Sequence, residues 1–161
     1  RFHHLLKSPA DFAATLNNEL GKVVKGESFA TAICGVVNAE QRTLRFAAAG
    51  GPPVLVVRSS GTFEELESSG LPFGMMEDAV YDEVTAQIAA GDGLLLFSDG
   101  AVEIHNAKDE MLGVDGLVHI LKNHGYPESG FRMNAVEEDL LKFSNAIRLD
   151  DDLTFIEARF N

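Results

Sequence analysis

The sequence predicts an α+β fold in which a mainly antiparallel β-sandwich is flanked by helices. Strand patterns outnumber helical patterns and mostly follow one another through short turns, while the helical patterns lie at the start and near the end of the chain. Strands joined by short turns pair antiparallel, and helices placed in this way pack outside the sheets. At 161 residues the chain has the length of one domain, so we expect a single domain over residues 1–161.

Local signals predict the first helix and the first hairpin. Ser8-Pro9-Ala10-Asp11 combines an N-cap serine, a proline at the first helical position and an acidic first turn. Apolar residues then recur on one helical face, which predicts a helix from Pro9 to Val24. Residues 29–37 are apolar on both alternating faces, which predicts a strand covered on both sides. A polar turn at 38–42 joins this strand to a second one at 44–48.

The rest of the chain alternates between turn signals and apolar runs. Gly50-Gly51-Pro52-Pro53 ends the second strand, and the strands on either side of it are expected to form an antiparallel meander. Gly91-Asp92-Gly93 is a tight-turn signal before the apolar run Leu94 to Phe97. The other expected elements are strands at 54–58, 62–67, 80–88 and 153–160 and helices at 114–122 and 132–143.

Composition and charge exclude several classes of function. The net charge is −12 and the pI is near 4.7, and no stretch concentrates Lys and Arg, so we expect neither nucleic acid nor a membrane as a partner. No segment has the roughly 18 unbroken apolar residues of a membrane span, and residues 1–7 lack the apolar core of a signal peptide. The lone cysteine, Cys34, is expected to be a small buried hydrophobe. These features predict a soluble, cytoplasmic protein.

Two groups of aspartates lie where apolar runs end or begin. Ser98-Asp99-Gly100 directly follows the run Leu94 to Phe97, and Asp150-Asp151-Asp152 precedes the terminal strand. Mg²⁺ and Mn²⁺ require oxygen ligands on rigid supports. Two carboxylates ~4 Å apart repel by roughly 4 kcal/mol at an effective dielectric constant of ~20, and a cation would remove that penalty. The residues alone leave two alternatives open, a capped turn at the first group and a solvated loop at the second.

Six blocks of residues occur in a fixed order along the chain. They are Phe29-Ala30-Thr31-Ala32, Ala49-Gly50-Gly51-Pro52-Pro53, Gly70-Leu71-Pro72-Phe73-Gly74, Gly91-Asp92-Gly93-Leu94-Leu95-Leu96-Phe97-Ser98-Asp99-Gly100-Ala101-Val102-Glu103, Asn106 with Glu110-Met111-Leu112-Gly113, and Asp151-Asp152-Leu153-Thr154. In this order they resemble the SpoIIE/RsbU-type bacterial serine/threonine phosphatases of the metal-dependent type 2C (PPM) superfamily. The resemblance runs from about Ser8 to the C-terminus, and the ordered set is far more specific than any one block.

The resemblance implies a PPM phosphatase-like fold with α-β-β-α layers and a binuclear Mn²⁺ or Mg²⁺ centre. In such a centre, a metal-activated water attacks a phosphoserine or phosphothreonine without a covalent intermediate. Asp99 and Asp151 match the family's metal ligands. By resemblance, the substrates are phosphorylated signalling proteins such as anti-sigma-factor antagonists, which would place the protein in bacterial signal transduction and stress response.

Other residues near these aspartates have lesser expected roles. Gly100 lets the chain turn sharply, and Glu103 fixes the same loop by hydrogen bonding. Thr154 orients the second aspartate loop, Asp152 is either an outer-shell acceptor or solvated, and Asp150 is expected to be solvated. The five histidines lack a recognisable ligand spacing. No catalytic residue beyond the metal ligands is therefore expected.

The sequence departs from the family's pattern in two places. The family's early segment, with a Gly-Gly-Asp type motif and an Asp-x-x-Gly-His-Gly block, has no counterpart here, and Gly51 stands where relatives usually carry His. We therefore expect an N-terminally truncated, partial PPM domain that is inactive or weak as a phosphatase in this form. The alternative is a non-catalytic binding module on the same fold, a pseudophosphatase. Loss of the early strands would expose sheet edges, which predicts a homodimer paired through those edges.

Overall fold

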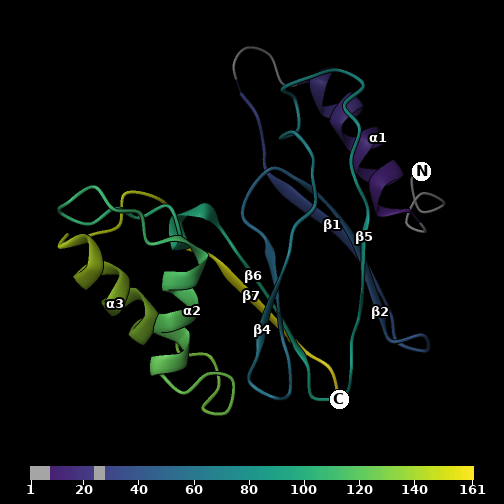
Figure 1. Ribbon diagram of the computed structural model, residues 1–161. Helices are drawn as coiled ribbons and strands as arrows, with labels where there is room; N and C mark the ends of the chain where they lie inside the picture. Colours follow the sequence, from purple (N-terminus) through teal and green to yellow (C-terminus); the bar gives the residue numbers. More distant parts are fainter. Residues whose placement is uncertain (1–7, 24–27) are drawn as a thin grey trace. The chain divides into compact units, whose positions relative to one another are not determined.

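The computed structural model describes residues 8–23 and 28–161 and contains two antiparallel sheets with helices (Figure 1). In that part of the chain there are three α-helices and seven β-strands. The chain divides into two compact units. The first contains the described residues up to Pro53 together with Leu66–Ala89, and the second contains Val54–Glu65 and Ala90–Asn161. The predicted α+β class with antiparallel sheets is confirmed.

The first unit is a helix packed on a three-stranded sheet. Its elements are α1 (Pro9–Gly21), β1 (Ala32–Asn38), β2 (Thr43–Ala49) and β5 (Val84–Gln87). The strands pair antiparallel in the order β1-β2-β5, and α1 packs against β1 and β2 (Figure 1). The helix begins as predicted, because the hydroxyl of Ser8 accepts a hydrogen bond from the N–H of Asp11 at 3.2 Å. The buried core of this unit is Ala13, Ala47, Ala49, Phe73, Ala79 and Tyr81.

Strand β1 differs most from the sequence-based expectation. It starts at Ala32, and Phe29, Val36 and Val37 are exposed. Among the described strands β1 pairs only with β2 and so forms the edge of its sheet. The prediction of a strand covered on both sides is therefore wrong. Cys34 in the same strand is half-buried, and this burial raises the pKa of its thiol.

Other elements of the first unit are shorter than predicted. Helix α1 ends at Gly21, in keeping with the low helix propensity of glycine, and the predicted end at Val24 lies outside the described residues. The strand expected at 80–88 is confined to β5, and Val80 is 82% exposed. The expected meander is interrupted as well, because β2 pairs with β5 while β3 belongs to the other sheet.

The second unit is a four-stranded sheet with two helices. Its elements are β3 (Val54–Val57), β4 (Phe63–Leu66), β6 (Gly93–Phe97), β7 (Phe155–Arg159), α2 (Gly113–Asn123) and α3 (Met133–Ser144). The strand order is β4-β3-β6-β7, and β6 pairs antiparallel with both neighbours. Each end of the two predicted helices lies within one residue of the observed one. None of the helices in the described residues is long and apolar enough to cross a membrane.

The core of the second unit joins α2 and α3 to the sheet. Its buried members are Leu55, Val57, Leu95, Phe97, Ala101, Val102, Leu117, Ile120, Leu121, Tyr126, Val136 and Leu140. At the end of α2, Nε2 of His124 lies 2.9 Å from Oδ2 of Asp139 on α3. Nζ of Lys142 donates to the other oxygen of Asp139 at 2.7 Å. The hydrogen bonds from Lys142 and His124 lower the pKa of the Asp139 carboxyl group, and the contact with His124 links the end of α2 to α3.

Asp92 fixes the start of β6 and provides a test of the fold. Its side chain is 2% exposed and accepts hydrogen bonds from Nη1 of Arg58 at 2.8 Å and from the N–H of Ser59 at 3.0 Å. Asp92→Ala removes the buried carboxylate that pairs with Arg58 and accepts the hydrogen bond from the N–H of Ser59. We therefore expect the free energy of unfolding in urea to fall by about 3 kcal/mol. Glu64→Gln alters the exposed partner of the same arginine and should lower it by less than about 1 kcal/mol. Equal losses would contradict this role of Asp92.

Candidate metal centre

Asp99 and Asp151 lie beyond the same end of two paired strands. Strands β6 and β7 are antiparallel, and Phe97 at the end of β6 pairs with Phe155 at the start of β7. The residues that follow β6 therefore leave the sheet beside those that precede β7. This pairing explains how two aspartates that are far apart in the sequence come to lie on neighbouring segments.

Ser98 joins these two segments by three hydrogen bonds. Its N–H donates to the carbonyl of Thr154 at 3.0 Å, and its hydroxyl oxygen accepts from the N–H of Thr154 at 3.0 Å. The same hydroxyl donates to the carbonyl of Asp152 at 2.8 Å. The serine therefore uses both its backbone and its side chain to hold the Asp151–Asp152 segment against the end of β6.

Gly100 brings the two segments into direct contact. A Cβ atom at this position would lie 2.5 Å from the carbonyl oxygen of Asp152 and 3.4 Å from Cβ of Asp151. The first of these distances is far inside van der Waals contact, and the atom that would be met belongs to the backbone. Glycine is thus the residue that permits this close approach.

The carboxylates of Asp99 and Asp151 retain most of their acceptor capacity. Oδ1 of Asp99 accepts a hydrogen bond from the N–H of Gly100 at 3.0 Å, and Oδ1 of Asp151 accepts one from the N–H of Asp152 at 2.7 Å. Within residues 8–23 and 28–161, neither aspartate forms an ion pair with a basic side chain. Since an ionised carboxylate has about four acceptor sites, both groups are available to a cation.

This donor set fits one hard divalent cation better than a pair of ions. In the part of the chain that the structure describes, no group of three or more His, Cys, Asp or Glu side chains could hold a metal. Mg²⁺ is nevertheless often bound by one or two carboxylates, with waters completing its octahedron. Asp99 and Asp151 are suited to that kind of site, and their assignment as metal ligands stays a prediction.

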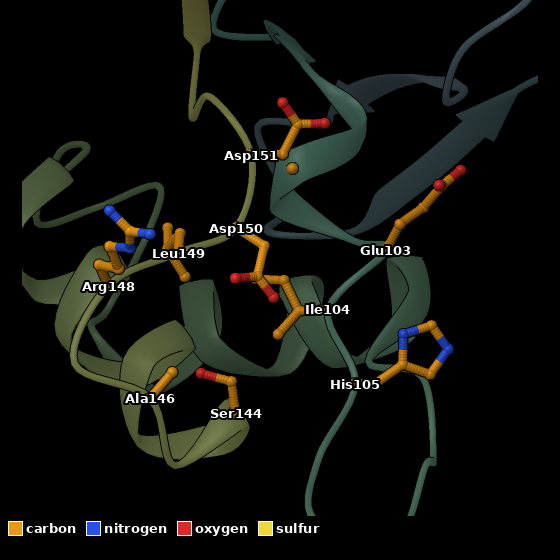
Figure 2. A pocket seen from close by; sticks show the side chains of 10 residues that line it. Glu103, Ile104, His105, Ser144, Ala146, Arg148, Leu149, Asp150 and Asp151 are labelled. Atoms are coloured by element: carbon orange, nitrogen blue, oxygen red, sulfur yellow. The ribbon is translucent and has the colours of Figure 1, made fainter.

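The other residues predicted to shape these loops act mainly through their backbones. Asp152 supplies the carbonyl that Ser98 binds, and Thr154 contributes its N–H and its carbonyl. The N–H of Glu103 donates to the carbonyl of Asp99 at 2.8 Å. The Glu103 side chain is exposed and points outward in Figure 2. Sequence reasoning assigned no role to Ser98, although a hydroxyl residue between an apolar run and an aspartate is a recognisable cap signal.

A pocket of about 530 Å³ borders Asp151 (Figure 2). The other residues that line it are Gly100, Glu103, Ile104, His105, Ser144, Ala146, Arg148, Leu149 and Asp150. They come from the segment after β6, from the end of α3 and from the segment before β7. Because the pocket combines segments that are far apart in the sequence, no local pattern predicts it.

Comparison with known proteins gives one consistent family. The family model for Stage II sporulation protein E (SpoIIE) matches residues 2–161. The chain is 26% identical over 152 residues to Phosphoserine phosphatase RsbU of Bacillus subtilis (strain 168), covering 94% of this chain and 45% of that protein. It spans 17% to 45% of the length of the curated relatives that it matches.

Solved structures show the same fold. The SiaA-PP2C domain of Pseudomonas aeruginosa matches with a TM-score of 0.73 and 19% identity, covering 95% of this chain and 60% of that one. The Mn-presoaked phosphatase domain of the cell fate determinant SpoIIE from Bacillus subtilis matches with a TM-score of 0.66 and 17% identity, covering 99% of this chain and 71% of that one. The chain therefore belongs to the SpoIIE family and has the fold of the PP2C-type phosphatase domains.

Proposed function

We propose that this chain forms part of a metal-dependent phosphatase that removes phosphate from phosphoserine or phosphothreonine in signalling proteins. The observation that carries the proposal is the contact between the Asp99–Gly100 and Asp151–Asp152 segments, which Ser98 and Gly100 maintain. Family membership supports it, and so does the name of RsbU, a phosphoserine phosphatase. Phosphorylated partners of the anti-sigma-factor-antagonist type are the proposed substrates.

In this proposal, Asp99 and Asp151 hold Mn²⁺ or Mg²⁺. When bound, the ion lowers the pKa of a coordinated water and neutralises charge that develops on the phosphoryl group. The protein's contribution is positioning, because phosphoryl transfer depends mainly on geometry and electrostatics. Ser98 fixes the second aspartate segment, and the backbone N–H groups of Gly100 and Asp152 orient the two carboxylates. A pair of ions needs further carboxylates, which we place outside the residues that the structure describes.

Removal of the metal tests the proposal. We expect the chain to release phosphate slowly from a phosphoserine peptide in the presence of Mn²⁺ or Mg²⁺, to lose this weak activity when a chelator is added, and to regain it when the ion is restored in excess. Phosphate release can be measured colorimetrically. Release that persists in excess chelator would contradict a metal-dependent mechanism.

A non-catalytic binding module is the second candidate. It is favoured by one observation, that the described residues bring together no group of three potential ligand side chains. Under this candidate, the chain binds the same peptide, yet no phosphate is released with either ion. Hydrolysis that depends on the ion excludes it.

A further inference from the structure

The pocket beside Asp151 combines an apolar wall with one carboxylate that points inward. Ile104, Ala146 and Leu149 supply apolar surface. Figure 2 shows the Asp150 carboxylate directed into the ring formed by the lining side chains, whereas the Glu103 carboxylate is directed away from it. Its volume, about 530 Å³, lies within the range of pockets that bind small ligands. It is therefore large enough for one long side chain.

Among the described residues, no basic side chain pairs with Asp150. Within the described residues, the structure records no hydrogen bond or ion pair to its carboxylate. Arg148 is the only Lys or Arg among the lining residues, and it too forms no recorded ion pair in that part of the chain. Lys and Arg side chains lay their methylene stems along apolar surface and place the charged head on an oxygen acceptor. An apolar wall beside an unpaired carboxylate matches that shape and charge.

We propose that this pocket is a specificity subsite that takes a Lys or Arg side chain flanking the phosphorylated residue of a protein substrate, with Asp150 as its charge partner. The inference rests on the proposed function, in which the neighbouring Asp151 holds the metal that faces the phosphate. Asp150 and Asp151 are adjacent in the chain, so a substrate whose phosphate lies near Asp151 brings its flanking residues near the pocket that both aspartates line. The net charge of −12 also attracts a basic flanking sequence.

Phosphoserine peptides that differ only at the positions next to the phosphoserine test the subsite. Each set carries Lys, Ala or Glu at one or two residues before or after the phosphoserine, and binding is measured by stopped-flow fluorescence anisotropy with Mn²⁺ present, before the peptide is hydrolysed. At one of these positions we expect the Lys peptide to bind up to about fivefold more tightly than the Ala peptide, the range of a partly exposed ion pair, and the Glu peptide to bind more weakly. Asp150→Asn should abolish this preference.

Asp109→Asn is the matched control, because Asp109 is exposed, lies outside the pocket and has a φ of 63° that asparagine also adopts. It makes the same change in charge and should keep the preference for Lys. Arg148→Ala should keep it too. The inference is overturned if no preference exists, if the preference survives Asp150→Asn, or if a Glu peptide binds best and loses its advantage in Arg148→Ala.

Measuring hydrolysis of the same peptides separates this inference from the proposed function. If no peptide is hydrolysed but the Lys preference in binding depends on Asp150, the subsite stands and the catalytic proposal fails. If all peptides are hydrolysed with no preference that depends on Asp150, the catalytic proposal stands and the subsite fails. The binding measurement therefore tests the subsite whether or not the chain hydrolyses the peptides.

Discussion

Replacing Asp99 or Asp151 with Asn is expected to lower kcat/KM for a phosphoserine peptide by about 100-fold or more, since even residues that only support metal ligands cost about 10- to 100-fold when changed. Each substitution removes one of the two carboxylates on the neighbouring segments beyond β6 and β7. Asparagine keeps the Oδ1 atom that accepts the backbone hydrogen bond of Gly100 or Asp152. Binding of Mn²⁺, measured by calorimetry, should weaken together with the activity.

The stability of these variants distinguishes a lost ligand from a damaged loop. Asp151 is exposed and Asp99 is partly exposed, so both variants should unfold within about 0.5 kcal/mol of the unmodified chain. Asp109→Asn provides the control for the change in charge and should leave activity and Mn²⁺ binding unaltered. If Asp99→Asn and Asp151→Asn hydrolyse the peptide at the normal rate, the two aspartates are not the metal ligands.

The helices of the second unit could be predicted almost to the residue because their signals are local. Apolar residues recur at helical spacing in α2 and α3, and no partner is needed to read this pattern. Strand β1 shows the limit of such reasoning. Val36 and Val37 are as apolar as core residues, yet both are exposed in a strand that lies at the edge of its sheet. Which strand pairs with which is a property of the whole chain, and the sequence pattern of one strand does not contain it.

The candidate site shows the same division between local and non-local information. The two groups of aspartates could be singled out because they lie where apolar runs end or begin, and the resemblance to the phosphatase family pointed to Asp99 and Asp151 within these groups. The approach of the two segments that carry them depends on the pairing of Phe97 with Phe155, which no single segment encodes. Asp150 was expected to be solvated, and it is exposed. It also lines a pocket, which the sequence could not show because the other lining residues come from the end of α3 and from the segment after β6.

Gly100→Ala is expected to weaken Mn²⁺ binding and hydrolysis about 100-fold, the usual effect of a displacement of about 1 Å at a reacting centre. The new Cβ would lie 2.5 Å from the carbonyl oxygen of Asp152, so the segment that carries Asp151 must move away. This movement lengthens the hydrogen bond between Ser98 and Asp152, and the free energy of unfolding should fall by about 1–3 kcal/mol.

Gly21→Ala makes the same chemical change where a Cβ meets nothing within 4 Å. Because alanine is the better helix former, this control should be neutral or stabilise the chain by up to about 1 kcal/mol, with Mn²⁺ binding unchanged. Gly100→Ala should resemble Asp151→Asn in its loss of metal affinity, but should differ from it in also being less stable. If Gly100→Ala lost stability yet bound Mn²⁺ normally, the contact between the two segments would matter for folding and not for the metal.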